Sequence, residues 1–184
     1  KNGKEEHIKE RIPDSIYFEI DEFSDINCPY PHTLLSNEQF SENLGKLGVQ
    51  NNNHLIVYDA FGIFSSSRAW WMFKSYGHKK VSILDGGLKK WKLDNLPIEK
   101  GNPKIISPTF YKANLTRENI VSYDDVKKNI TKQKFVLVDA RPSGRFDGTS
   151  PEPRKEIKSG SIPNSINIPY TDLVDQVTGC YKKK

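Results

Sequence analysis

Residues 135–170 read FVLVDARPSGRFDGTSPEPRKEIKSGSIPNSINIPY. The apolar run from Phe135 to Val138 breaks abruptly into Asp139 and a loop rich in Gly, Pro, Ser and charge, and a second apolar segment, Ile166–Ile168, follows that loop. A short apolar run that ends in a charged, glycine-bearing loop is typical of a strand in a parallel sheet. Because ligands of open α/β sheets bind beyond the carboxyl ends of such strands, we expect this loop to be functional.

The loop carries three arginines, Arg141, Arg145 and Arg154. An arginine side chain presents a planar fork of N–H donors that matches a carboxylate or a sulfur oxyanion. The sequence therefore predicts an anionic ligand.

Upstream of this loop, short apolar runs alternate with helical patterns. Ser36 followed by Gln39 is a capping box, which predicts a helix through Leu47 that Gly48 ends. Strands are predicted at 16–21, 54–58 and 81–84. Ser65 or Ser66 is predicted to cap a further helix, and other helices are predicted at 88–93 and at 121–130. Residues 97–114 are predicted to be extended. This alternation predicts an α/β fold with parallel sheets and helices on both faces.

Two parts of the chain repeat each other. Ile12-Pro13-Asp14-Ser15-Ile16 matches Ile162-Pro163-Asn164-Ser165-Ile166 at an offset of 150 residues. The strand end at residues 58–59 lies 46 positions after residue 12, so its counterpart would fall near 162 + 46 = 208. The strand end at 138–139 likewise lies 24 positions before residue 162, so its counterpart would precede residue 1. We therefore expect a chain truncated at both ends.

Composition excludes several classes of function. The formal charge is +5 and the lysines are scattered, whereas a nucleic-acid reader typically has a concentrated basic stripe. No apolar run approaches the ~18 residues of a membrane span. Two cysteines, Cys28 and Cys180, are too few for a metal cluster, and the absence of a recognisable secretory signal favours a cytoplasmic location. Cys180 lies close to three lysines near the end of the sequence, and we interpret it as a surface thiol.

These motifs resemble the tandem-rhodanese sulfurtransferases, which act on thiosulfate or 3-mercaptopyruvate. The resemblance rests on residues 137–170 for the C-terminal domain and, for the N-terminal domain, on IPDSIYFEID, VYDAFGIFSSSRAWWMFKSYGH and VSILDGGLKKW. It implies two α/β domains: a catalytically silent copy at 1–101 without its first strand, a linker at 102–118, and the first half of the catalytic copy at 119–184. It also implies sulfur transfer through a cysteine persulfide, with no organic cofactor and no metal.

The resemblance also assigns site residues. Asp59 stands where the family's nucleophile would lie in the silent copy, and the nucleophilic cysteine of the catalytic copy would lie beyond residue 184. Arg145 and Arg154 match the arginines that bind the substrate carboxylate in mercaptopyruvate enzymes, which favours 3-mercaptopyruvate over thiosulfate. Arg141 is expected to pair with nearby carboxylates or the backbone. Asp21 and His32 match a proposed catalytic relay. An alternative is that His32 only orders its proline-rich loop.

The partners implied are a small anionic sulfur donor and a thiol, thioredoxin or cyanide as acceptor, with no nucleic acid and no membrane. A different class of function is also open: a silent rhodanese-like module used for docking. The absent cysteine favours such a module, and the intact arginine pair argues against it.

Overall fold

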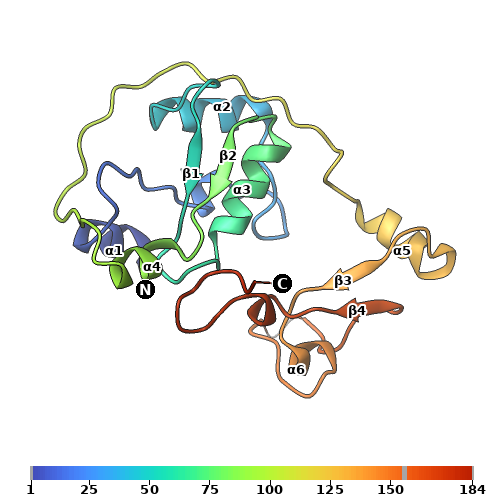
Figure 1. Ribbon diagram of the computed structural model, residues 1–184. Helices are drawn as coiled ribbons and strands as arrows, with labels where there is room; N and C mark the ends of the chain where they lie inside the picture. Colours follow the sequence, from blue (N-terminus) through green and yellow to red (C-terminus); the bar gives the residue numbers. More distant parts are fainter. Residues whose placement is uncertain (1, 155–156, 184) are drawn as a thin grey trace. The chain divides into compact units, whose positions relative to one another are not determined.

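The computed structural model describes residues 2–154 and 157–183, and the chain divides into two compact units (Figure 1). Unit one comprises Lys1–Asn119 and Thr178–Cys180, and unit two comprises Ile120–Val177 and Tyr181–Lys184. Each unit contains one pair of parallel strands accompanied by helices. The predicted α/β class is confirmed.

Unit one is built around strands β1 (Leu55–Val57) and β2 (Val81–Ile83), which pair in parallel with Leu55 opposite Val81. Helix α3 (Ser66–Ser75) packs against both strands. The other elements are α1 (Gly3–Lys9), the 3-10 turn η1 (Asp21–Phe23), α2 (Asn37–Lys46) and α4 (Gly87–Leu93).

The helix ends of unit one follow the local sequence. Ser36 and Gln39 form the predicted capping box at the start of α2. After α2 and α3, Gly48 and Gly77 adopt φ of 73° and 80°, a left-handed conformation that glycine adopts without steric cost. At Gly77, the amide of His78 donates to the carbonyl of Phe73 and the amide of Gly77 to that of Lys74, which is a Schellman motif.

The predicted strand at 16–21 is wrong. Residues 16–19 belong to no strand, Ile20 already has a helical backbone with φ of −59° and ψ of −34°, and η1 begins at Asp21. A strand is defined by hydrogen bonds to a neighbouring strand. Among the described residues none provides such a ladder for Ile16–Ile20.

The hydrophobic core of unit one is aromatic. Phe40 is fully buried and stacks on Tyr76 with 3.6 Å between ring centroids. The Tyr76 hydroxyl donates to the carbonyl of Leu35 at 2.7 Å, so burial leaves it satisfied. Segment 102–118 has no regular structure, yet its Tyr111 is 2% exposed. The hydroxyl oxygen of Tyr111 lies 3.0 Å from Nδ1 of His78. This segment therefore contributes to the core as well as connecting the two units.

Unit two contains α5 (Tyr123–Lys132), β3 (Leu137–Asp139), α6 (Ser143–Phe146), β4 (Ser165–Asn167) and the 3-10 turn η2 (Tyr170–Leu173). β3 and β4 pair in parallel, with Asp139 opposite Asn167. The helix α6 lies in the segment that was predicted to be loop. The apolar strand residues stay largely open to solvent, with Val138 49% and Ile166 48% exposed.

The internal repeat is present in the backbone. Asp14 and Asn164 both adopt left-handed φ, 59° and 63°. In each copy the amide that follows, of Ser15 or Ser165, donates to the isoleucine carbonyl three residues back at 3.2 Å. Asp and Asn tolerate this conformation better than other non-glycine residues, so either residue allows the same turn.

Candidate functional site

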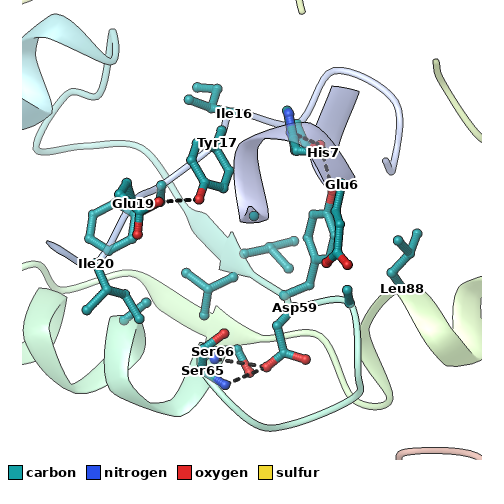
Figure 2. A pocket seen from close by; sticks show the side chains of 18 of the residues that line it. Glu6, His7, Ile16, Tyr17, Glu19, Ile20, Asp59, Ser65, Ser66 and Leu88 are labelled. Atoms are coloured by element: carbon teal, nitrogen blue, oxygen red, sulfur yellow. Dashed lines mark hydrogen bonds between the residues drawn. The ribbon is translucent and has the colours of Figure 1, made fainter. Parts of the chain in front are cut away.

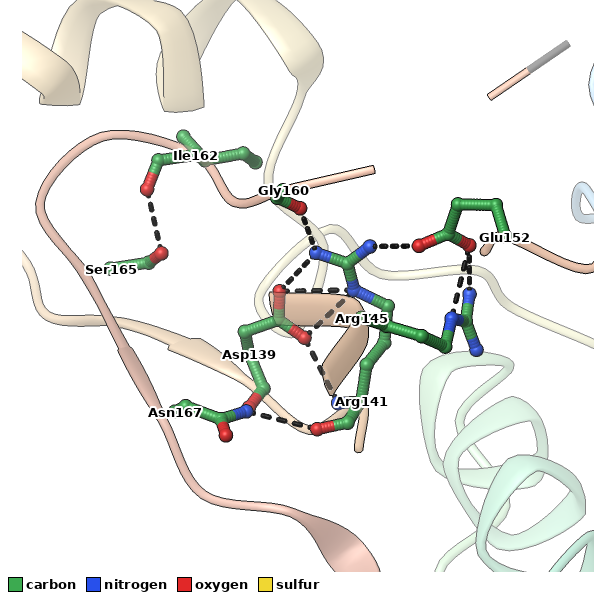
Figure 3. A network of polar contacts seen from close by, with 8 residues as sticks. All are labelled: Asp139, Arg141, Arg145, Glu152, Gly160, Ile162, Ser165 and Asn167. Carbon is green, nitrogen blue, oxygen red and sulfur yellow. Dashed lines mark hydrogen bonds and ion pairs between the residues drawn. The ribbon is translucent and has the colours of Figure 1, made fainter. Parts of the chain in front are cut away.

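A network of two arginines and two carboxylates lies at the carboxyl end of β3 (Figure 3). Nε of Arg141 donates to both carboxylate oxygens of Asp139 at 3.0 Å, and its Nη2 donates to Asp139 at 2.6 Å and to the carbonyl of Gly160 at 2.7 Å. Its Nη1 donates to Oε1 of Glu152 at 2.8 Å. Every nitrogen of the Arg141 guanidinium is therefore engaged, as expected for an arginine with a structural role.

Arg145, on α6, shares the same glutamate. Oε2 of Glu152 accepts from Nε of Arg145 at 3.0 Å and from its Nη2 at 2.5 Å. The Glu152 side chain is only 2% exposed, whereas that of Arg145 is 29% exposed. Within the described part of the chain, Nη1 of Arg145 has no partner. One edge of the Arg145 guanidinium, formed by Nε and Nη2, is thus bound to Glu152, and the Nη1 side is open to a ligand.

The electrostatics of the network follow from these contacts. The hydrogen bond from Arg145 holds the pKa of Glu152 below its ordinary value, and the hydrogen bond from Arg141 does the same for the pKa of Asp139. Asp139 in turn raises the pKa of Arg141. Two guanidinium groups face two carboxylates, so the network as a whole carries no net charge.

Arg154, the second predicted ligand of the substrate carboxylate, lies in the loop between α6 and β4. Its side chain is exposed, and among the described residues it pairs with no carboxylate. Its positive charge is therefore not balanced by an ion pair within the described part of the loop. Sequence reasoning missed Glu152, although its place in Pro151-Glu152-Pro153, next to Arg154, was a signal that its backbone is restrained.

The structure brings Asp21 and His32 together in unit one. Nδ1 of His32 lies 3.1 Å from Oδ1 of Asp21, and both side chains are accessible, 48% exposed for His32 and 75% for Asp21. His32 has a left-handed φ of 58°. Its carbonyl accepts a short hydrogen bond from Arg68, whose guanidinium stacks 4.5 Å from the ring centroid of Trp71. The pair therefore rests on a strained backbone that α3 holds in place.

Asp59 follows β1 and organises the loop that leads to α3. Its Oδ1 accepts from the amide of Phe61 at 3.0 Å, and its Oδ2 accepts from those of Phe64, Ser65 and Ser66 at 2.7, 2.8 and 3.0 Å. The expectation that a serine side chain caps α3 is wrong, because Ser65 occupies the cap position without making a capping hydrogen bond. The carboxylate of Asp59 performs that function, as a negative charge does favourably at a helix N-terminus.

A cleft of about 1360 Å³ opens in unit one between residues 14–21 and β1 (Figure 2). Its apolar lining includes Ile56, which is 60% exposed and lies on the open edge of β1. Tyr17 lines the cleft beside Glu19, and burial, followed by that carboxylate, raises the pKa of Tyr17. Asp21 and Asp59 line the cleft as well, whereas His32 does not.

Other kinds of site are not found in the described residues. No three His, Cys, Asp or Glu side chains come together as a metal site there. None of the helices is both long and apolar enough to cross a bilayer within the described ranges. Cys28 and Cys180 are free thiols, both partly exposed.

Comparison with known proteins places these features in context. Residues 2–94 match the model of the rhodanese-like domain. The chain is 42% identical over 178 residues to human 3-mercaptopyruvate sulfurtransferase, covering 96% of this chain and 60% of that protein. The crystal structure of Tum1 from Saccharomyces cerevisiae superposes with a TM-score of 0.90 at 34% identity, covering 98% of this chain and 62% of that one.

A second solved structure is that of SseA from Escherichia coli, a 3-mercaptopyruvate sulfotransferase with the rhodanese fold. It superposes with a TM-score of 0.89 at 36% identity over all of this chain and 67% of its own. The chain spans about 60% of the length of the curated relatives that it matches.

Proposed function

Since the chain belongs to the rhodanese-like domain family, we propose that it is part of a sulfurtransferase that takes sulfur from 3-mercaptopyruvate. The sulfur would pass through a cysteine persulfide to a thiol, thioredoxin or cyanide. The named relatives at about 40% identity support this proposal, together with the arginine cluster after β3.

Arg145 and Arg154 would bind the carboxylate of the donor. Arg145 offers the free Nη1 side of its guanidinium, and Arg154 contributes a positive charge that no neighbouring carboxylate balances in the described residues. A carboxylate held there would position the donor sulfur for attack by a cysteine thiolate. The carbon–sulfur bond of the donor would then break, with the sulfur retained as a persulfide and pyruvate released after protonation.

Asp21 and His32 would handle protons in this reaction. Their contact of 3.1 Å and their exposure are what a histidine needs to exchange protons with a substrate or with solvent. The competing interpretation, that His32 only orders its loop, is supported by the hydrogen bond from Arg68 to the His32 carbonyl. Replacement of the side chain separates the two, because it leaves the backbone contact in place.

The two units would divide the work. We propose that residues 1–101 are the silent copy and that 119–184 belong to the catalytic copy, with 102–118 as the connection. Asp59 fills its amide cluster with a carboxylate, and this supports the silent assignment because no thiolate can occupy the same place. The nucleophilic cysteine of the catalytic copy would lie outside these 184 residues.

The proposal depends mainly on the guanidinium of Arg145, which binds Glu152 through Nε and Nη2 and keeps its Nη1 side open. In the full-length protein, Arg145→Ala and Arg154→Ala should each raise KM for 3-mercaptopyruvate, because losing a hydrogen bond to a charged group costs about 1.5–3 kcal/mol. Unchanged KM values in both variants would remove the arginines from the site. A higher kcat/KM for thiosulfate than for 3-mercaptopyruvate would favour the thiosulfate branch.

A rhodanese-like docking module remains the second candidate. The 184-residue chain is expected to form no thiocyanate from cyanide, because neither Cys28 nor Cys180 is in register with the family's nucleophile. Formation of thiocyanate that Cys180→Ser abolishes would overturn this register. A full-length protein that also fails to turn over either donor would favour the docking module.

A further inference from the structure

We propose that Glu152 is a positioning residue, which fixes the guanidinium of Arg145 so that a substrate carboxylate binds its free Nη1 side. This inference rests on the proposed function and adds the direction from which the substrate is held. It also implies that the substrate carboxylate binds Arg145 while Glu152 stays bound to the same guanidinium.

The two oxygens of the Glu152 carboxylate bind different arginines. Oε1 binds Arg141, and Oε2 binds the edge of Arg145 formed by Nε and Nη2. That edge is the one through which arginine usually grips a carboxylate side-on. Because Glu152 occupies it, a second carboxylate can reach Arg145 only through the remaining hydrogens, on Nη1 and the outer side of Nη2.

Glu152 is itself firmly held. Its side chain is 2% exposed, and the prolines on either side restrict the backbone of the residues around it. Arg141, its other partner, is fixed by Asp139 and by the carbonyl of Gly160 (Figure 3). A substrate would have to break a buried ion pair in order to replace Glu152, and removing one partner of such a pair leaves an uncompensated charge.

The net charge of the network determines how strongly it attracts an anion. Asp139 and Glu152 balance Arg141 and Arg145, so the network alone offers an incoming anion no net attraction. Arg154, in the same loop, carries a further positive charge that no ion pair balances among the described residues. The two arginines would therefore have different tasks: Arg145 sets the orientation of the carboxylate, and Arg154 adds electrostatic attraction.

The test compares two substitutions in the full-length protein. Glu152→Asp keeps the charge but is one methylene too short to reach both arginines, and Glu152→Gln keeps the length but presents N–H groups to a guanidinium. If Glu152 positions Arg145, both variants raise KM for 3-mercaptopyruvate about tenfold, the effect of one charge-assisted hydrogen bond, and kcat changes far less. Asp124→Asn, which removes an exposed charge from α5 of the same unit, is the matched control and should leave KM unchanged.

The opposite pattern would overturn the inference. If Glu152 merely competes with the substrate for Arg145, Glu152→Gln lowers KM and Glu152→Asp leaves it unchanged. If Arg145→Ala raises KM and neither Glu152 variant does, only this inference fails. If Arg145→Ala leaves KM for 3-mercaptopyruvate unchanged, both this inference and the proposed role of Arg145 in binding the substrate are wrong.

A second measurement observes the guanidinium of Arg145 directly and leaves Glu152 unchanged. In nitrogen-15 spectra of the full-length protein titrated with pyruvate, the Nε–H signal of Arg145, assigned by its loss in Arg145→Lys, should stay in place while the Nη signals move. An Nε–H signal that moves as far as the Nη signals would mean that the ligand displaces Glu152.

Discussion

Asp14 and Asn164, 150 residues apart, hold nearly the same left-handed backbone, with φ of 59° and 63°. Each lies in a turn closed by the same 3.2 Å hydrogen bond between backbone groups. The two units therefore share a turn geometry that their sequences encode with different residues.

Replacing Asn164 tests the cost of this turn. Alanine lacks the tolerance of asparagine for positive φ, so Asn164→Ala should destabilise unit two by about 1–2 kcal/mol relative to Asn164→Gly. Both variants lose the hydrogen bond from Asn164 to the Ile130 carbonyl, so their difference isolates the backbone term. Urea denaturation of the two variants measures this difference, and equal midpoints would contradict the argument.

Replacing Asp59 tests the loop before α3. Asp59→Ala removes the acceptor of four amides, and each buried donor left without a partner costs about 1–3 kcal/mol, less where water can reach it. We expect a clear fall in the unfolding midpoint of unit one and a smaller fall for Asp59→Asn, which keeps one acceptor oxygen. Asp94→Ala, which breaks an exposed ion pair with Lys90, is the control and should cost well under 1 kcal/mol. A control that costs as much as Asp59→Ala would remove the loop from the explanation.

Neighbouring aromatic residues test whether segment 102–118 belongs to the core. Tyr111 is 2% exposed and Phe110 is 82% exposed. Tyr111→Ala should destabilise unit one by about 3–5 kcal/mol, as expected for a large buried aromatic side chain, whereas Phe110→Ala should have little effect. Thermal unfolding of the two variants gives the comparison. Similar losses in both would mean that the segment only connects the units.

The arginine–carboxylate network predicts an acid-sensitive unit two. The pKa values of Asp139 and Glu152 are lowered by their arginine partners, so the native state binds their protons less readily than the unfolded chain does. Their stabilising effect is therefore complete above the unfolded pKa of about 4 and is lost as pH falls through the lowered native values. Unfolding midpoints between pH 7 and pH 2 should show this loss.

The matched variant for this experiment is Glu152→Gln. It should be less stable than the native chain at pH 7 and should lose less stability on acidification, because one titrating carboxylate is gone. Parallel pH curves for the two chains would show that Glu152 does not contribute to the acid sensitivity.

Local signals explain what the sequence predicted correctly. The capping box at Ser36, the glycines after α2 and α3, and the alternation of apolar runs all act over a few residues, so they can be recognised without the fold. The contact between Asp21 and His32 was expected only through resemblance to known proteins.

The features that the sequence did not predict depend on residues outside the local segment. Residues 16–20 have the composition of a strand, but a strand also needs a neighbour, and none of the described residues provides one. The cap of α3 comes from Asp59, six residues before Ser65, and not from the adjacent serine. The role of Glu152 depends on two arginines that lie 11 and 7 residues before it in the sequence. No periodic pattern encodes such pairs.

The carboxylate that fills the amide cluster after β1 also bears on resistance to oxidation. A cysteine held by the same amides would be stabilised as a thiolate, and thiolates are the form that peroxides convert to sulfenic and then to irreversible sulfinic acids. Asp59 cannot enter that series of reactions. The loop from Asp59 to Ser66 should therefore keep its hydrogen bonds under peroxide concentrations that inactivate a persulfide-forming cysteine.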